Sequence, residues 1–504
     1  MDTDRSVPAH ADLVIKNGRV IDPRSNTDAT MNVAVTGKTI VYVGESDVSS
    51  GNVVDAAGLV VAPGFIDLHS HAQTPLGLGL QALDGVTSAF DLEAGELPVA
   101  VHYQAARSEG RPLNFGFSAS WALARLHVMA GIELPNHRTD RALIGGLELF
   151  QRNQMNPAWR RHASKREVDQ IIGLLEAQLA DGALGIGVLL GYAPECGREE
   201  YFRIAQLAAS AGVPVFTHSR YMSNTEPGSS LEGTLEILGV AAGSGAHMHI
   251  CHINSTSLRR IDEVAEAVAR AHAMGNRVST EAYPYTMSST GIGAAFLAPE
   301  HLDRLGIGPQ QITYLPTGRK VTNSDELNYL RANNPGGLCL IEYLDSSQPG
   351  DIALLLKSLT LPESIVASDA LPIVGPAGNY LSGHGPIPDG SRVHPRSAGT
   401  FSRTFGWLVR TLGAMSLSEA VLRTATLPAE LLGSFVPSMR RKGRVLEGYD
   451  ADITVFDPEL ILDRATPSSI APSTGIRLVI VNGETVAVDG ILTGATPGEG
   501  TRAV

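Results

Sequence analysis

The feature that most constrains this sequence is an alternation of strands and helices that recurs from about residue 63 to 435. In one unit Ser164 and Glu167 form a capping box, apolar residues follow at helical spacing, and the buried run ALGIGVLL comes next. Two further units repeat this order, with helices that end at Gly212 and Gly275. Because no dinucleotide-binding glycine motif interrupts the repetition, the pattern predicts an α/β fold built on a TIM (β/α)8 barrel.

Both ends of the chain have a different pattern, with short alternating apolar runs broken by glycine turns. Asn-Gly pairs at Asn17-Gly18 and Asn482-Gly483 lie between such runs, and this pairing is typical of two-residue hairpins. The two ends therefore predict a small β-sandwich domain built from both termini, formed by residues 1–62 and 436–504.

The remaining residues, 63–435, are predicted to form the barrel domain. One connection within it, at about 291–363, is long for a barrel loop and contains clusters of Pro, Gly and Asn. We interpret this stretch as an insertion over the barrel mouth that acts as a lid.

Composition limits the function classes. The 504-residue chain has a formal net charge of −13, and a basic face for nucleic acid is not evident. No long apolar run predicts a membrane span, and the first ten residues lack the features of a signal peptide, so the sequence predicts a cytoplasmic protein. The three scattered cysteines, Cys196, Cys251 and Cys339, do not suggest a disulfide framework. Any metal ligands must therefore come from His, Asp and Glu.

The sharpest local signal is GFIDLHSH, in which a buried strand ends in His69 and His71. Two residues apart on a strand, the two imidazoles leave the same face and can share a metal ion. Later strands also end in polar residues, His218 after VPVFT, His252 after AHMHIC and Asp369 after SIVAS. A barrel gathers all such strand ends at one mouth, so these five residues are candidate metal ligands.

The second barrel strand, VTSAFDLEAG, offers Asp91 and Glu93 on one face. We expect Glu93, nearer the carboxyl end, to bridge or support the metal ions, with Asp91 as the alternative ligand and solvation of both as a third reading. The fourth strand, ALGIGVLL, contains no lysine to serve as a carbamylated bridge, which favours Glu93. Strand alternation further predicts that His247 and His249 point away from His252, and that Cys251 is inert packing.

These motifs resemble the amidohydrolase superfamily and, within it, the N-acyl-D-amino-acid deacylases, also called D-aminoacylases. The similarity spans almost the whole chain and includes IKNGRVIDP, GFIDLHSH, CHINSTS, ASDALP and KGRVLEGYDADITVFDP. The motifs YPYT and HPRSAGTF are narrower and indicate the deacylase branch.

The resemblance implies a role for each matched residue. His69 and His71 would hold one metal ion, and His218 and His252 the other. Asp369 would act as general base toward water and then as general acid toward the leaving amine. Arg396 and Tyr283 would bind the substrate carboxylate, with the guanidinium pairing bidentately.

Two positions depart from the family pattern. The family has an Asn-Cys-Gly segment whose cysteine binds zinc, where this chain has Glu93-Ala94-Gly95. The family also commonly has a lysine two residues after the sixth-strand histidine, where this chain has Asn254, a candidate substrate-binding residue. The first departure affects how many metal ions the site is expected to bind. The second removes a positive charge that could bind the substrate carboxylate.

The leading hypothesis is a zinc-dependent amidohydrolase, with one or two Zn²⁺ per chain, that cleaves a small N-acyl amino acid, the D form favoured. The first alternative is a cyclic amide hydrolase of the hydantoinase or dihydroorotase type, which the missing strand-four lysine disfavours. The second is a barrel without catalysis that serves as a scaffold, which the full set of histidines and Asp369 disfavours. No nucleic acid or membrane partner is expected, and homo-oligomerisation stays open.

Overall fold

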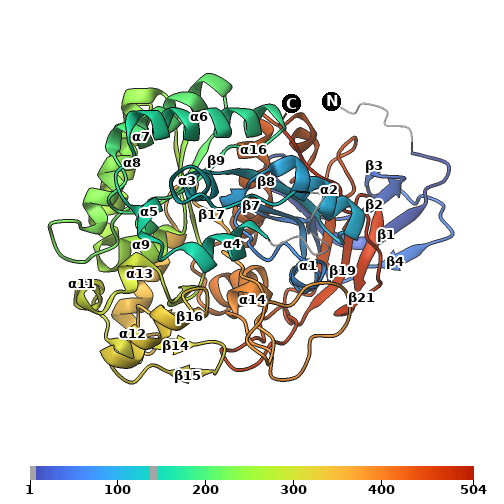
Figure 1. Ribbon diagram of the computed structural model, residues 1–504. Helices are drawn as coiled ribbons and strands as arrows, with labels where there is room; N and C mark the ends of the chain where they lie inside the picture. The colour runs from blue at the N-terminus through green and yellow to red at the C-terminus, as the bar shows by residue number, and fades with distance from the viewer. Residues whose placement is uncertain (1–6, 137–144, 504) are drawn as a thin grey trace.

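The computed structural model describes residues 7–136 and 145–503, so residues 1–6 of the predicted β domain lie outside the described part. Its centre is a parallel eight-stranded sheet in strict chain order, β6-β7-β8-β9-β10-β11-β12-β17 (Figure 1). The strands are β6 (Phe65–Asp67), β7 (Val86–Glu96), β8 (Asn114–Ser120), β9 (Ile186–Leu189), β10 (Val215–His218), β11 (Met248–Ile250), β12 (Val278–Ala282) and β17 (Ile365–Val366). A parallel bridge between Ser70 and Ala370 joins the two ends of the sheet, so the predicted TIM-type barrel is confirmed.

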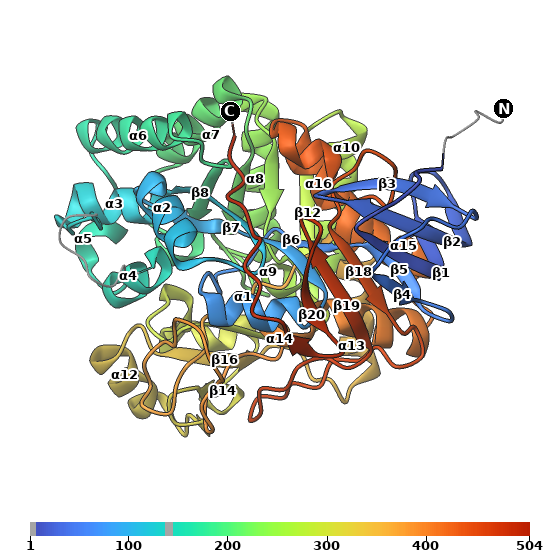
Figure 2. The same cartoon turned by 90° about the vertical axis from the view of Figure 1, so that its right-hand side faces the viewer.

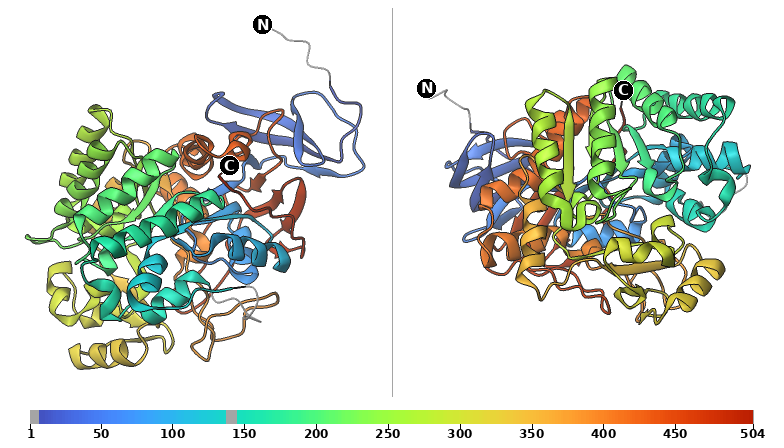
Figure 3. Two further views of the ribbon diagram at one scale, coloured as in Figure 1. Left: turned by 45° about the horizontal axis from the view of Figure 1, so that its top comes forward. Right: turned by 90° about the vertical axis from the view of Figure 1, so that its left-hand side faces the viewer.

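Helices cover the outside of the sheet, as the green helices in Figure 3 show. The capping box of Ser164 and Glu167 is present at the start of α6, and α7 ends at Gly212 in the left-handed conformation, both as predicted. The α-helices are α1 (Pro75–Ala82), α2 (Val99–Glu109), α3 (Trp121–Ala130), α4 (Gly146–Asn153), α5 (Pro157–Arg160), α6 (Lys165–Ala180), α7 (Arg198–Ala211), α8 (Ser230–Ser244), α9 (Ile253–Ser257), α10 (Ile261–Ala273), α11 (Leu302–Leu305), α12 (Ser324–Asn333), α13 (Pro349–Leu359), α14 (Arg396–Arg403), α15 (Leu417–Val421) and α16 (Leu427–Gly433).

Strands from the two ends of the chain join one nine-stranded sheet beside the barrel (Figure 2). Its N-terminal strands are β1 (Leu13–Asp22), β2 (Thr27–Thr36), β3 (Thr39–Gly44), β4 (Val53–Asp55) and β5 (Val60–Pro63), and its C-terminal strands are β18 (Ile453–Phe456), β19 (Ile476–Val481), β20 (Glu484–Val488) and β21 (Ile491–Leu492). β5 pairs with β1 on one side and with β18 on the other, which links the two groups. This extra sheet confirms the second part of the predicted fold class, while the boundaries at 62/63 and 435/436 stay predictions.

The two Asn-Gly pairs differ in outcome. Asn482-Gly483 forms the predicted turn, because Val481 pairs with Glu484 across it. Asn17-Gly18 lies inside β1, where the register against β2 shifts between Ile15 and Gly18, so the hairpin predicted there is wrong. Asn17 has a φ of 60°, so the pair forms a bulge that the long strand β1 continues through.

A four-stranded sheet, in the order β13-β16-β14-β15, occupies much of the predicted insertion and begins just before it with β13. Its strands are β13 (Met287–Gly291), β14 (Ile312–Tyr314), β15 (Arg319–Lys320) and β16 (Leu338–Glu342), and α11 and α12 accompany them (Figure 1). The insertion has a hydrophobic core of its own, which includes Ile292, Leu302, Leu327 and Cys339. It is therefore a packed subdomain, and its action as a lid stays a prediction.

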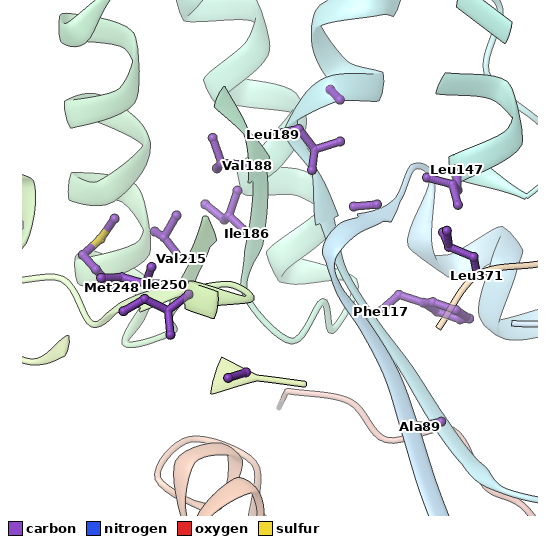
Figure 4. Close-up of a cluster of buried hydrophobic side chains, with 14 of the residues drawn as sticks. Ala89, Phe117, Leu147, Ile186, Val188, Leu189, Val215, Met248, Ile250 and Leu371 are labelled. Atoms are coloured by element: carbon purple, nitrogen blue, oxygen red, sulfur yellow. The ribbon is translucent and has the colours of Figure 1, made fainter. Parts of the chain in front are cut away.

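The barrel strands separate two apolar clusters. One cluster lies between the strands and the covering helices, where Figure 4 shows Val215 and Ile250 among other strand side chains. The other includes Leu68, Phe216 and Cys251 and extends to α16. Adjacent residues such as Val215 and Phe216 belong to different clusters, so the second cluster fills the barrel interior beneath the mouth. Among the described residues, no helix combines the length and apolar character that crossing a membrane requires.

Candidate metal centre

His69 and His71 follow β6 directly and are buried at the barrel mouth. Their Nε2 atoms lie 3.0 Å apart. The buried carboxylate of Asp67 fixes this turn, because it accepts hydrogen bonds from the backbone N–H of His69 at 3.2 Å and of Ser368 at 2.9 Å. Burial outweighs these hydrogen bonds and raises the pKa of Asp67 to about 6. Asp67 thus ties the first barrel strand to the last, a role that the sequence analysis did not find.

Two carboxylates complete the first half of the centre. Glu93 Oε2 lies 3.2 Å from His69 Nε2 and 3.6 Å from His71 Nε2. Asp369 Oδ1 lies 3.5 Å and 3.7 Å from the same two nitrogens. Donor atoms at about 2.1 Å from a tetrahedral ion are about 3.4 Å from one another. The four side chains therefore have the spacing of a ligand set.

The second half of the centre shares Glu93. His252 Nε2 lies 2.8 Å from Glu93 Oε1, and the rings of His218 and His252 are 4.9 Å apart between centroids. Glu93, His218 and His252 offer donor atoms that all lie within 4.8 Å of one another. Glu93 thus has one oxygen beside His69 and His71 and the other beside His252, and its role as a bridging ligand stays a prediction.

Hydrogen bonds behind the histidines orient the rings. His69 Nδ1 contacts Glu281, and His71 Nδ1 lies 3.0 Å from Asp91 Oδ1. His218 Nδ1 lies 3.0 Å from the carbonyl oxygen of Ser219. Such contacts fix the tautomer and direct the other ring nitrogen toward a metal ion. Asp91, the alternative ligand in the sequence analysis, therefore lies behind His71, and Glu93 takes the inner position.

Strand alternation does not apply at His252. β11 ends at Ile250, and His252 has a φ of 32°, so the backbone turns before the histidine. Below this turn, His249 Nε2 lies 3.0 Å from Glu281 Oε2, and Cys251 forms a third group of donors with His69 and Glu281. Cys251 packs in the apolar cluster of the barrel interior, as predicted, although its thiol also lies beside His69 and Glu281. His249 belongs to none of the groups of candidate metal donors among the described residues, and its direction relative to His252 stays a prediction.

The carboxylates around the histidines favour the binding of cations at this site. Burial lowers the pKa of His71, but the Asp91 carboxylate outweighs it and raises the value to about 9. Burial lowers the pKa of His218 to about 4, so this ring is neutral at pH 7 with a lone pair available. A metal ion replaces such protons and satisfies the surrounding carboxylates. Imidazole and carboxylate donors in this number fit Zn²⁺.

A glycine in the fourth barrel strand gives the Glu93 backbone room to approach that strand. Gly187 in β9 stands beside the Glu93 backbone, and a Cβ there would lie 2.2 Å from the Glu93 carbonyl oxygen. Only glycine leaves room for this contact. The fourth strand thus contains no lysine, and its glycine leaves room for the backbone of Glu93.

Arg396 and Tyr283 flank the other oxygen of Asp369. Arg396 Nη2 lies 2.8 Å from Asp369 Oδ2, and its Nε donates to the Asp369 carbonyl oxygen at 2.7 Å. The guanidinium carbon lies 4.6 Å from the centre of the Tyr283 ring. Arg396 Nη1 and the Tyr283 hydroxyl are buried without a hydrogen-bond partner among the described residues. Two donors beside Asp369 are thus free to receive an anionic group.

Asn254 is close to this corner but already engaged. Its Nδ2 donates to the Tyr343 hydroxyl at 2.7 Å, and its Oδ1 accepts from the Tyr283 backbone N–H at 3.3 Å. Tyr285, two residues beyond Tyr283, instead donates to Asp463 at 3.2 Å. The structure therefore brings Asn254 near the site as a support for Tyr283, and its role as a direct substrate contact stays a prediction.

The comparisons with known proteins agree with this arrangement. The family model described as "Amidohydrolase family" matches residues 52–297. Three curated proteins of Alcaligenes xylosoxydans xylosoxydans are similar over nearly the whole length: an N-acyl-D-glutamate deacylase (28% identity, 94% of this chain and 93% of the relative), a D-aminoacylase (27%, 97% and 96%) and an N-acyl-D-aspartate deacylase (27%, 99% and 97%).

Two solved structures share the fold. The crystal structure of a D-aminoacylase matches with a TM-score of 0.76 and 23% identity, over 98% of this chain and 100% of that one. The N-acyl-D-glutamate deacylase of Bordetella bronchiseptica, solved with zinc and a phosphonate that mimics the tetrahedral intermediate, matches with the same score, identity and coverage. In its barrel, its buried donors and its overall sequence, the chain is therefore similar to amidohydrolases, and to N-acyl-D-amino-acid deacylases over nearly its whole length.

Proposed function

We propose that this protein is a zinc-dependent hydrolase that cleaves the amide bond of an N-acyl amino acid, the D form favoured, to give a carboxylate and a free amino acid. The observation that carries the proposal is the position of Asp369. Its Oδ1 faces the donor cluster, and its Oδ2 faces Arg396, whose Nη1 has no hydrogen-bond partner within the described part of the chain. One carboxylate thus lies between a metal centre and an anion-binding corner.

The ligands proposed for one or two Zn²⁺ are His69, His71, Glu93, His218, His252 and Asp369. Zinc held there supplies Lewis-acid polarisation of the substrate carbonyl and an activated water at neutral pH. Asp369 accepts the proton of the attacking water and passes it to the amide nitrogen as that bond breaks. Its φ of 52° and its contacts with Arg396 hold the carboxylate in one orientation for both transfers.

The substrate carboxylate binds at Arg396 and Tyr283. The resemblance implies that the Arg396 guanidinium binds the substrate carboxylate bidentately. It cannot do so, because its Nη2 and Nε are already bound to Asp369. We propose instead one hydrogen bond from Arg396 Nη1 and a second from the Tyr283 hydroxyl. Burial raises the pKa of Tyr283 to about 12, so the hydroxyl remains a donor at neutral pH.

Support for the D configuration comes from the three curated deacylases, whose names refer to D-amino acids or their acyl derivatives. We also propose a cytoplasmic location, which agrees with three buried cysteines that form no disulfide among the described residues.

The test is hydrolysis of N-acetyl-D-methionine and N-acetyl-L-methionine by zinc-loaded protein, with bound zinc quantified in the same sample. The proposal expects release of D-methionine, at least tenfold faster than of L-methionine, with one or two zinc ions per chain. Bound zinc without release of either amino acid, and without release of D-glutamate from N-acetyl-D-glutamate, would overturn the substrate class and favour cyclic amides. Protein that binds no zinc would overturn the metal centre itself.

A further inference from the structure

The cavity above the donor cluster has a strongly apolar wall. It encloses about 760 Å³ including its opening, and the donors His71, Glu93, His218, His252 and Asp369 form its floor. The wall includes Phe150, Tyr192, Met222, Phe296, Leu305 and Ile307. A substrate whose amide lies over the donors must therefore place its other substituents against apolar side chains.

Aromatic rings extend this apolar wall to His218 in the donor cluster. The Phe296 ring stacks on His218 with 5.7 Å between centroids, and the Tyr192 ring meets His218 edge-on at 5.0 Å. Phe150 packs against Tyr192 at 5.3 Å. The apolar surface thus begins at the first layer of metal-binding side chains, and bound water has little room to solvate a charged group there.

Much of the wall comes from the insertion. Phe296, Leu305 and Ile307 belong to it and pack on its own hydrophobic core. Among the described residues, its one hydroxyl group in the cavity lining, that of Tyr343, donates to the Tyr285 carbonyl oxygen at 3.0 Å. Just before the insertion, Ser289 donates to the Cys339 carbonyl oxygen and Thr290 is hydrogen-bonded to Tyr192. The insertion therefore offers the substrate apolar contacts and few free polar groups.

The cavity also lacks a cation for a second negative charge. None of its lining residues in the described part of the chain is lysine or arginine. Behind Asp369, the Nη1 atom of Arg396 has no hydrogen-bond partner within residues 7–136 and 145–503, and this donor serves one carboxylate. A second carboxylate would be buried without a counter-charge, at a large cost in free energy. An apolar substituent would instead bind favourably in proportion to the area that it buries.

We infer that this enzyme selects substrates with one carboxylate and apolar substituents, and that it rejects acyl amino acids with a second carboxylate on the side chain or the acyl group. The inference rests on the proposed function and specifies its substrate class. Overall identities of 28%, 27% and 27% do not separate the glutamate, general and aspartate types among the relatives. The wall of this cavity, which has no lysine or arginine among its described residues, favours a neutral side chain.

The test compares substrates of similar length and different polarity. With zinc-loaded wild-type protein, kcat/KM is measured for N-acetyl-D-methionine, N-acetyl-D-glutamine and N-acetyl-D-glutamate, and for N-butanoyl- and N-succinyl-D-methionine. We expect the order methionine, glutamine, glutamate, with at least a ~100-fold difference between the first and last, and a similar preference for butanoyl over succinyl. Equal or faster cleavage of the glutamate derivative would overturn the inference and leave the proposed function intact. No cleavage of any acyl-D-amino acid would overturn both.

Binding provides a second readout. Phosphonate mimics of the tetrahedral intermediate that carry a methionine or glutamate side chain are titrated by calorimetry, and the methionine form should bind at least ~100-fold more tightly. Met222→Lys places an ammonium in the wall at nearly constant length, and Met222→Gln is the neutral control. Only the lysine variant should raise the glutamate-to-methionine ratio of kcat/KM, by about tenfold or more. An unchanged ratio in a folded, zinc-containing Met222→Lys variant would contradict the placement of substituents against this wall.

Discussion

The donor cluster at the barrel mouth and the ion-pair cluster around Lys442 are both buried, and they differ in their balance of charge. Lys442 Nζ lies 2.5 Å from Asp452 and 3.1 Å from Asp450. Asp452 also accepts hydrogen bonds from the Asn482 backbone and the Asn114 side chain, which joins the nine-stranded sheet to the barrel. Each charge in this cluster has an opposite partner.

At the mouth the charges do not balance. Glu93 and Asp369 face four histidines, and Asp91 and Glu281 lie behind two of them. The single guanidinium in contact is that of Arg396, on one oxygen of Asp369. A buried cluster with paired charges holds parts of a fold together, whereas an excess of buried carboxylates and imidazoles requires a cation. The comparison therefore assigns stability to Lys442 and metal binding to the mouth.

Metal removal gives the largest expected difference between the two clusters. Dialysis against a chelator should abolish hydrolysis and lower Tm, because an ion that binds only the folded state stabilises it. Readdition of zinc should restore both activity and Tm. Hydrolysis by protein that elemental analysis shows to be free of metal would contradict the different roles given to the two clusters.

Asp369→Asn removes the proposed proton carrier with little change in shape. We expect kcat/KM for N-acetyl-D-methionine to fall by about 1000-fold or more, because general acid–base groups contribute roughly 10²–10⁴ in rate. Because Asp369 is also a proposed ligand and pairs with Arg396, the assay contains excess zinc, and zinc content and unfolding in urea show how much of the loss comes from metal or stability. A variant that retains a tenth of wild-type activity would remove Asp369 from the mechanism.

Lys442→Met should act in the opposite way, on stability and not on activity. It leaves the buried Asp452 without its cation and Asp450 with only the exposed Arg441, which should cost about 3 kcal/mol of unfolding free energy. Lys16→Met is the matched control: this lysine pairs with Asp47 at 2.8 Å on the surface, and such a pair contributes less than about 1 kcal/mol. The free energies are measured in urea, and kcat of the folded variants should equal that of wild type. Equal costs for the two substitutions would contradict the role given to Lys442.

Glu281→Gln gives the smallest of these effects and sharpens the account of the mouth. Glu281 contacts His69 Nδ1 from behind, so its loss should weaken zinc binding by about 10–100-fold without removing a ligand. Competition with a chelator of known affinity measures the change. Excess zinc should restore kcat, and a variant with unchanged zinc affinity would mean that Glu281 serves only packing.

Local signals in the sequence predicted features that depend on neighbouring residues. The capping box at Ser164, the turn at Asn482-Gly483 and the position of His69 and His71 at a strand end all follow from a few adjacent residues. His218, His252 and Asp369 could also be predicted to lie near this pair, because the carboxyl ends of all barrel strands lie on one face of the barrel.

Other features depend on contacts that the sequence does not encode locally. Asn17-Gly18 has the same two residues as the true turn, but β1 continues through it because β2 and β5 pair along its length. Glu281 lies within a buried strand, and only the neighbouring strand ends show that it supports His69 and His249. The left-handed backbone at His252 is likewise not visible in the strand alternation of AHMHICH.

The most direct test of the account is a zinc titration of metal-free protein, followed by release of D-methionine from N-acetyl-D-methionine. The account predicts that the rate rises with bound zinc and reaches its plateau at one or two ions per chain. His71→Asn and His252→Asn, which remove one donor from each half of the centre, should weaken binding. Zinc that binds at this stoichiometry without any hydrolysis, or hydrolysis that does not depend on zinc, would contradict the central claim.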